Sequence, residues 1–386
     1  MAGDHATVLR ILDDLTGSLT GVRPPGLRVR VSPRVLASGE VARLVVDRVG
    51  PAADGWVLRV RDDAGLLPWS SEAAPGGFDL PALPEGRYVV ELADGATGAY
   101  PAAEFFVSKR PLAEVRLALE ARLAALTSPE NVRESLRARL DLLDADPPLD
   151  RAVHLLEDPL RLAGDLAEEI AVAEKGDDPY RRRPGELWRV ASQGGTRVPL
   201  RVFAPAGLGD EPAPLVGALH GAGGDENLFV HGLGNGRLKA LAEEHGFVVV
   251  TPLTYPLAAS PRLFDAVLEA ATGCHRIDAS RIYLLGHSLG AMTAAQLAAQ
   301  RPERFAAVVC IGGGGAAPEG ARFLFVAGEQ DPLFPPWRLR RVAEASRAAG
   351  ARADLRAIPG VGHTLVVGEA LPACVAWLLE QRREAR

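Results

Sequence analysis

The sequence predicts an α/β protein whose carboxyl-terminal part is a mostly parallel sheet, preceded by a small antiparallel β-sandwich and a helical connector. From Glu186 onward, short apolar runs alternate with helical patterns, which is typical of parallel strands covered by helices on both faces. Over residues 26–110, apolar and polar residues alternate in short runs separated by Gly, Pro, Asp and Ser, as in half-buried antiparallel strands. Between these regions, from Pro111 to about Asp178, apolar residues recur every three to four positions, which indicates helices.

The composition is that of a globular protein. The chain has 386 residues, of which 47% are hydrophobic and 24% charged, enough for two or three folding units. Its net charge of −6 argues against a nucleic-acid partner, because phosphate binding needs a basic surface. The three cysteines, Cys274, Cys310 and Cys374, do not suggest a disulfide framework, and no cluster of His and Cys suggests a metal site. We therefore expect neither a metal nor a cofactor.

The amino terminus carries Asp4, Asp13 and Asp14 and no basic segment ahead of an apolar stretch, so we expect no secretory signal. No run of 18 apolar residues occurs, so we expect no membrane span. These two observations favour a cytoplasmic protein. The sequence does not indicate an oligomeric state.

Four regions follow one another along the chain. Residues 1–25 contain a predicted short helix. Residues 26–110 are predicted to form a β-sandwich that is immunoglobulin-like in architecture only, because no Cys and Trp pair stands at immunoglobulin spacing. Residues 111–185 form a helical connector and linker, in which we interpret Arg181–Arg183 as a solvated hinge. Residues 186–386 form the α/β domain, which we expect to be catalytic.

The elements of the two sheet regions can be placed from their residue patterns. The expected sandwich strands are 27–33, 41–49, 56–63, 77–83, 87–95 and 100–110. The α/β domain should open with a hairpin of 186–192 and 197–205, followed by strands at 214–221, 247–253, 281–288, 306–313, 322–328 and 353–359. Its expected helices are 237–245, 261–273, 291–300, 336–350 and 370–384.

A serine between two glycines stands where strand 281–288 gives way to helix 291–300, in the stretch Gly286-His287-Ser288-Leu289-Gly290. A sharp strand-to-helix turn strains the serine backbone, and glycines two positions away relieve the crowding. The hydroxyl is then exposed at a helix amino terminus, which favours negative charge. A plain serine-glycine turn is the alternative, but the strand before and the helix after favour a nucleophile.

A serine nucleophile needs a base and an orienting acid. His363 is the only histidine after Ser288, and it lies in the glycine-rich loop PGVGHTLV after the last predicted strand. Asp331 lies in FLFVAGEQDPLFPP, just beyond a strand end, whereas Asp354 lies at the far end of its strand. We therefore expect His363 to be the base and Asp331 to be the orienting acid, with Glu329 as the alternative acid.

The oxyanion of an acyl-transfer reaction needs hydrogen-bond donors. The N–H of Leu289, directly after the nucleophile, should be one donor. The glycine-rich loop LHGAGGDENLF should supply the second, because Gly221 and Gly223 allow close backbone approach to a substrate while Ala222 or Gly223 presents an N–H. No Gly-Lys-Ser/Thr follows, so nucleotide binding is disfavoured. We expect His220, at the start of this loop, to tie it down.

The sequence indicates the residues that line the substrate-binding site less clearly than it indicates the candidate catalytic residues. His287 adjoins the nucleophile, and we expect it to contribute packing or substrate contact. Tyr255 and Phe334, together with Phe229 and Trp337, are candidate wall residues, each of which could equally be plain core. Only AAPEGAR separates the run IGGGG from the next strand, so we expect no large lid there and favour short acyl groups.

The motifs HGAGG, GHSLG, GEQD followed by PP, and GVGH together resemble those of the α/β-hydrolase superfamily, over roughly residues 186–384. Within it the chain looks most like the esterase, polyhydroxybutyrate-depolymerase and dienelactone-hydrolase-like groups. The resemblance implies Ser288 as nucleophile, His363 as base and Asp331 as acid, with Leu289 and Ala222 as oxyanion donors. The oxyanion motif departs from the HGGG of many lipases. Some hydrolases of this class carry an amino-terminal immunoglobulin-like domain.

The resemblance implies a carboxylesterase-type serine hydrolase that cleaves small-molecule esters of short to medium acyl groups through an acyl-enzyme. A serine peptidase of the same fold is the second reading, and a perhydrolase is a minor third. From a different class, the chain could be a binding protein that works through its β-domain.

Overall fold

The computed structural model describes residues 26–48, 55–94, 98–147 and 152–383. The helix predicted within residues 1–25 lies outside the described residues. The chain divides into two compact units. The first unit comprises the chain up to residue 125 and residues 140–168, and the second comprises residues 126–139 and 169–386.

The first unit contains two β-sheets around a shared hydrophobic core. Its strands are β1(Leu27–Ser32), β2(Val35–Ala37), β3(Arg43–Arg48), β4(Val57–Asp62), β5(Trp69–Glu72), β6(Gly76–Asp79), β7(Gly86–Asp94) and β8(Gly98–Ser108). One sheet has the order β1-β3-β6 and the other β2-β8-β7-β4-β5, with only β2 and β8 parallel. Leu44, Leu58 and Phe105 from the two sheets are fully buried in one cluster. The predicted antiparallel sheets are confirmed, whereas the immunoglobulin-like assignment stays a prediction.

Helices connect the two sheet regions, as the sequence predicts. They are α2(Leu112–Ala124), α3(Glu130–Leu140), α4(Ala152–Leu156) and α5(Pro159–Glu174). In the second unit, the buried Glu169 carboxylate pairs with Arg139 and also with Arg183. A buried carboxylate is costly unless it is paired, so Arg183 contributes to neutralising Glu169. The interpretation of Arg181–Arg183 as a solvated hinge is therefore wrong for Arg183.

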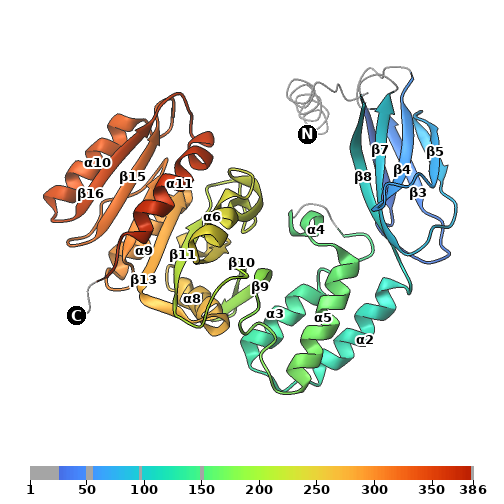
Figure 1. The fold of residues 1–386 in the computed structure, drawn as a ribbon, viewed down its shortest axis with the longest axis horizontal. Helices are drawn as coiled ribbons and strands as arrows, with labels where there is room; N and C mark the ends of the chain where they lie inside the picture. The colour runs from blue at the N-terminus through green and yellow to red at the C-terminus, as the bar shows by residue number, and fades with distance from the viewer. Residues whose placement is uncertain (1–25, 49–54, 95–97, 148–151, 384–386) are drawn as a thin grey trace. The chain divides into compact units, whose positions relative to one another are not determined.

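An eight-stranded sheet forms the centre of the second unit (Figure 1). Its strands are β9(Gly185–Gln193), β10(Thr196–Ala204), β11(Ala213–Leu219), β12(Val248–Pro252), β13(Ile277–His287), β14(Ala307–Ile311), β15(Arg322–Gly328) and β16(Arg352–Ile358). Their order is β16-β15-β14-β13-β11-β12-β10-β9. The opening hairpin and the β10–β12 pair are antiparallel, and the other pairs are parallel. β12 lies on one side of β11 in the sheet, whereas β13, the next strand along the chain, lies on the other side of β11. Open α/β sheets place their ligands at such a switch point.

Helices bury both faces of this sheet. They are α6(Arg237–His245), α7(Thr254–Ala259), α8(Leu263–Cys274), α9(Leu289–Gln300), α10(Pro336–Ala348) and α11(Leu365–Leu379), and a π-helical turn spans η1(Leu228–Gly232). Side chains of α8, α9 and α10 share one cluster with Leu284 of β13, whereas α6 and α11 share another with Tyr283 and Leu285. Burial on both faces explains why the strands are continuous apolar runs rather than alternating ones.

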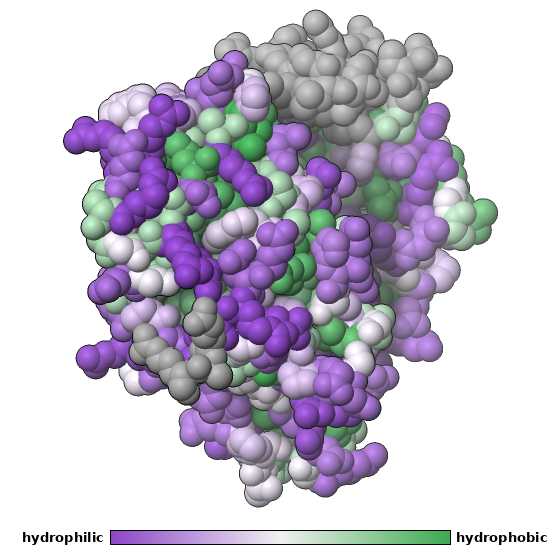
Figure 2. All heavy atoms as spheres, turned by 60° about the vertical axis from the view of Figure 1, so that its left-hand side comes forward, coloured by the Kyte–Doolittle hydropathy of each residue, from purple (hydrophilic) through white to green (hydrophobic). Residues whose placement is uncertain are grey.

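The exposed side chains are mostly polar, as expected when the apolar residues are buried in the core (Figure 2). Figure 2 shows mostly hydrophilic side chains on the face it presents, with small hydrophobic areas between them. None of the helices within the described ranges has both the length and the apolar composition that crossing a membrane requires.

Candidate functional site

Ser288 occupies a strained turn between the end of β13 and the start of α9. Its backbone has φ 53° and ψ −114°, which an L-residue rarely adopts. The flanking glycines are required by close backbone approach, since a Cβ on Gly286 would lie 2.3 Å from the Gly290 carbonyl oxygen and one on Gly290 1.9 Å from that of Leu219. The Ser288 hydroxyl makes no capping hydrogen bond to α9, so it is not committed to the helix.

Asp331 and His363 form a hydrogen-bonded pair. His363 Nδ1 lies 2.7 Å from Asp331 Oδ2, and the buried Oδ1 accepts the backbone N–H groups of Leu333 at 2.8 Å and Phe334 at 2.9 Å. Burial on its own raises the pKa of Asp331, but the N–H groups of Phe334 and Leu333 and the His363 ring outweigh it and hold that pKa below its usual value. An ionised carboxylate accepts from Nδ1–H, which leaves Nε2 of the His363 ring available as a base.

A glycine pair after β14 lies against both Ser288 and the Asp331–His363 pair. A Cβ on Gly312 would lie 3.2 Å from Cε1 and Nδ1 of His363 and 3.3 Å from Asp331 Oδ2. A Cβ on the next residue, Gly313, would lie 2.6 Å from the carbonyl oxygen of Ser288. The structure therefore gathers the three predicted residues around one loop. Sequence reasoning did not assign this loop a role, although four successive glycines at a strand end were a visible signal.

The alternative acids lie elsewhere. Glu329 is exposed and accepts the backbone N–H of Gly360 at 3.1 Å, and Asp354 is exposed on β16. Neither carboxylate bonds to the His363 ring, whose Nδ1 already meets Asp331.

His287 lies behind His363 and is buried. Its Nε2 lies 2.9 Å from the His363 carbonyl oxygen, and the two rings are 4.8 Å apart. Burial lowers the pKa of His287 to about 4, although the hydrogen bond to the His363 carbonyl acts in the opposite direction. A neutral His287 therefore donates through Nε2 and holds the His363 backbone, which corresponds to the packing role expected for it.

Hydrogen bonds of His220 hold the loop after β11 in place beside Ser288. His220 Nε2 accepts the N–H of Thr254 at 2.9 Å, so Nδ1 carries the ring proton and donates to the Gly221 carbonyl at 2.8 Å. Burial lowers the pKa of His220, which favours this neutral ring. A Cβ on Gly221 would lie 3.2 Å from Ser288 Cβ, so the loop can approach this closely only as glycine. The expectation that His220 ties down the loop is confirmed.

The backbone N–H groups of Ala222 and Gly223 are the two candidate oxyanion donors of this loop. Gly223, with φ +83°, donates its N–H to the Tyr255 hydroxyl at 2.6 Å, and Tyr255 is 42% exposed. The N–H of Gly223 is therefore occupied, and Ala222, which is exposed, is the better candidate for the second oxyanion donor. Leu289 opens α9, where the first N–H groups of a helix have no partner within the helix.

Three hydrogen bonds anchor the continuation of this loop to neighbouring strands. Trp188 Nε1 donates to Glu226 Oε1 at 2.7 Å, Thr251 Oγ1 donates to the Glu226 carbonyl at 2.6 Å, and Arg201 Nε donates to Asn227 Oδ1 at 2.8 Å. All five residues are buried. Sequence reasoning missed these positioning residues, for which the polar run Asp-Glu-Asn after the glycines was the available signal.

The candidate wall residues differ in their burial. Phe229 is 1% exposed and belongs to the core cluster of α6 and α11, so it is not a wall residue. Phe334 is partly buried and stacks on the His363 ring at 6.0 Å. Tyr255 and Trp337 are exposed.

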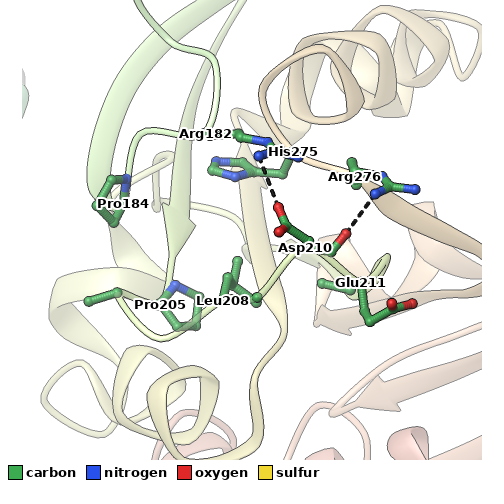
Figure 3. Close-up of a pocket in the computed structure, with 11 residues that line it drawn as sticks. Arg182, Pro184, Pro205, Leu208, Asp210, Glu211, His275 and Arg276 are labelled. Atoms are coloured by element: carbon green, nitrogen blue, oxygen red, sulfur yellow. Dashed lines mark hydrogen bonds and ion pairs between the residues drawn. The ribbon is translucent and has the colours of Figure 1, made fainter.

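A polar pocket of about 130 Å³ lies at the amino ends of β11 and β13, and Figure 3 shows the residues that line it. Ala213 and Arg276, which line it, stand at the amino ends of β11 and β13, whereas Ser288 follows the carboxyl end of β13. Arg182 Nη1 pairs with Asp210 Oδ1 at 2.9 Å, and Arg276 Nη1 donates to the Asp210 carbonyl at 2.8 Å. This pocket is therefore separate from the candidate active site. Within the described residues, no group of three or more His, Cys, Asp and Glu side chains could hold a metal ion.

Comparison with known proteins adds a family model and several relatives. The model described as alpha/beta hydrolase fold matches residues 254–320. Feruloyl esterase B of Neurospora crassa is 29% identical over 128 residues, covering 29% of this chain and 42% of the relative. Acetylxylan esterase A of Emericella nidulans is 28% identical over 148 residues, covering 34% and 47%. The chain thus spans less than half the length of these two curated relatives.

Among solved structures, an S-formylglutathione hydrolase from Agrobacterium tumefaciens is similar at 19% identity and a TM-score of 0.43, covering 51% of this chain and 94% of that one. The family model covers the turn at Ser288 and the glycine loop after β14. Together with the sheet order and its mostly parallel pairing, it shows that the second unit has the α/β-hydrolase fold.

Proposed function

We propose that this chain is a serine hydrolase that cleaves carboxylic esters of short to medium acyl groups. The hydrogen bond of 2.7 Å between His363 and Asp331, beside the strained turn of Ser288, carries the proposal. The similarity to proteins named as esterases supports the substrate class.

The residues can be assigned to two chemical steps. His363 Nε2 takes the proton of Ser288 Oγ as this oxygen attacks the ester carbonyl, and Asp331 stays ionised and stabilises the imidazolium. The N–H groups of Leu289 and Ala222 receive the oxyanion, each contributing about 3–4 kcal/mol to the lowering of the barrier. His363 then returns the proton to the leaving alcohol. Water, activated by the same ring, releases the acid and restores Ser288.

The preference for short acyl groups rests on the loop between β14 and β15. Residues 312–321 join these strands, and no helix is inserted between them. The triad is therefore not covered by an inserted lid at this point, and a long acyl chain would find no inserted helix to enclose it there.

The test is a panel of p-nitrophenyl esters from acetate to palmitate, run beside aminoacyl p-nitroanilides. We expect turnover to be highest with the short esters and to vanish in Ser288→Ala. Ser260→Ala is the matched control, because Ser260 is an exposed serine of the same unit. Ester turnover that survives in Ser288→Ala would refute the nucleophile assignment, and amide turnover above ester turnover would favour a serine peptidase.

A further inference from the structure

An open groove of about 610 Å³ lies along the first turns of α10. Leu333 and Trp337 line it and are 56% and 61% exposed. Five smaller apolar residues also line it: Ala316, Pro332, Pro335, Val342 and Ala345. Two large apolar side chains this exposed within one hollow indicate a surface that meets an apolar group.

The groove adjoins the acid loop, residues 329–335, which carries Asp331. Leu333, which lines the groove, donates its N–H to Asp331, and the next residue, Phe334, stacks on the His363 ring. Ala316, which also lines the groove, follows the Gly312–Gly313 pair that packs closely against His363, Asp331 and Ser288. The groove therefore lies on the acid-loop side of the candidate triad.

The groove also carries positive charge. Arg338 and Arg341 line it. Arg338 stacks over the Phe334 ring at 4.5 Å and donates to the Leu333 carbonyl at 3.0 Å, which fixes its guanidinium against the acid loop. Within the described part of the chain, neither arginine forms an ion pair, and the next acidic residue along α10, Glu344, does not line the groove. In a chain of net charge −6, two uncompensated arginines beside apolar side chains select for an anion.

We propose that this groove is a specificity subsite for an ester that bears a free carboxylate behind an apolar spacer. The inference rests on the proposed esterase function and names the substrate class of that same site. Leu333 and Trp337 bind the spacer. Arg338 and Arg341 bind the carboxylate, to which a guanidinium can donate two parallel hydrogen bonds.

Matched ester pairs test the subsite. On the acyl side, the p-nitrophenyl monoester of suberic acid is compared with p-nitrophenyl octanoate. On the alcohol side, 4-acetoxybenzoate is compared with 4-methylphenyl acetate. We expect kcat/KM to favour the carboxylate member of at least one pair about tenfold or more, through KM, and to lose this preference as salt is raised.

Variants then locate the effect. Arg341→Gln should lower the ratio of carboxylate to neutral kcat/KM about tenfold, and Arg338→Gln should act in the same direction. Arg340→Gln is the matched control, because Arg340 is an exposed arginine of α10 that does not line the groove. Calorimetric titration of Ser288→Ala with the suberate monoester should show binding that Arg341→Gln weakens.

The outcomes separate the two proposals. Absence of turnover for every ester would refute the esterase function itself. Turnover of neutral esters with no carboxylate preference in either pair, or an equal fall of the ratio in Arg340→Gln, would overturn the subsite alone.

Discussion

Replacing Asp331 with asparagine tests the acid–base pair most directly. Asp331 serves different partners with its two oxygens, since Oδ1 accepts the N–H groups of Leu333 and Phe334 and Oδ2 faces His363 Nδ1. In Asp331→Asn the single amide oxygen has to serve the two backbone donors, because leaving buried N–H groups unpaired costs about 1–3 kcal/mol each. The amide NH2 group then faces the His363 ring.

An amide NH2 group only donates, so Nδ1 of His363 must accept and the ring proton moves to Nε2. A ring protonated at Nε2 cannot take the proton of Ser288. In Ser-His-Asp triads this change of tautomer costs about 10⁴ in kcat, which corresponds to about 5 kcal/mol of barrier. We expect a loss of that size here, with the fold intact.

The measurement is kcat for p-nitrophenyl acetate, together with the thermal midpoint of each variant. Glu329→Gln is the matched control, because Glu329 lies in the same loop but is exposed, and its carboxylate accepts the Gly360 N–H rather than facing the His363 ring. A loss below tenfold in Asp331→Asn with an unchanged midpoint would refute the reasoning, as would an equal loss in Glu329→Gln.

Three further predictions concern stability. The free energy of unfolding should fall by about 3 kcal/mol from about pH 6.5 to about pH 4, because burial holds the pKa of native His287 at about 4 while the unfolded chain binds the proton first. Urea midpoints of His287→Gln should lose this part of the pH dependence, and an unaltered dependence would contradict the assignment. Gly290→Ala should abolish soluble, active protein, because its Cβ would lie 1.9 Å from a backbone oxygen of β11, whereas Gly273→Ala has open space and should be tolerated in the same assays. Trp188→Phe should lower the free energy of unfolding by about 1–3 kcal/mol, since the buried Glu226 carboxylate loses a donor; an unmoved urea midpoint would speak against that role.

Much of the fold could be predicted from the sequence because its signals are local. Hydrophobic period distinguishes strands from helices within a short window, and it located the strands of the eight-stranded sheet. The hydrophobic pattern did not reveal β2, β5 and α7, which have three, four and six residues. A repeat of apolar residues is hard to recognise in such short segments. The turn at Ser288 was also visible, since the steric need for Gly286 and Gly290 arises within five successive residues.

The tertiary structure decided the partners, because they depend on which distant segments the sheet brings together. It selected Asp331 over Glu329 by placing its Oδ2 2.7 Å from the His363 ring. It assigned the Gly223 N–H to Tyr255 and buried Phe229 in the core, neither of which the local pattern could show. The sequence by itself determined the strands of the sheet, the turn at Ser288 and the chain order of the three candidate residues, Ser288, Asp331 and His363. Only the packing of the loops after β14, β15 and β16 could show that Asp331 and His363 pair beside the Ser288 turn, since hydrogen bonds between remote residues are set by strand order and register.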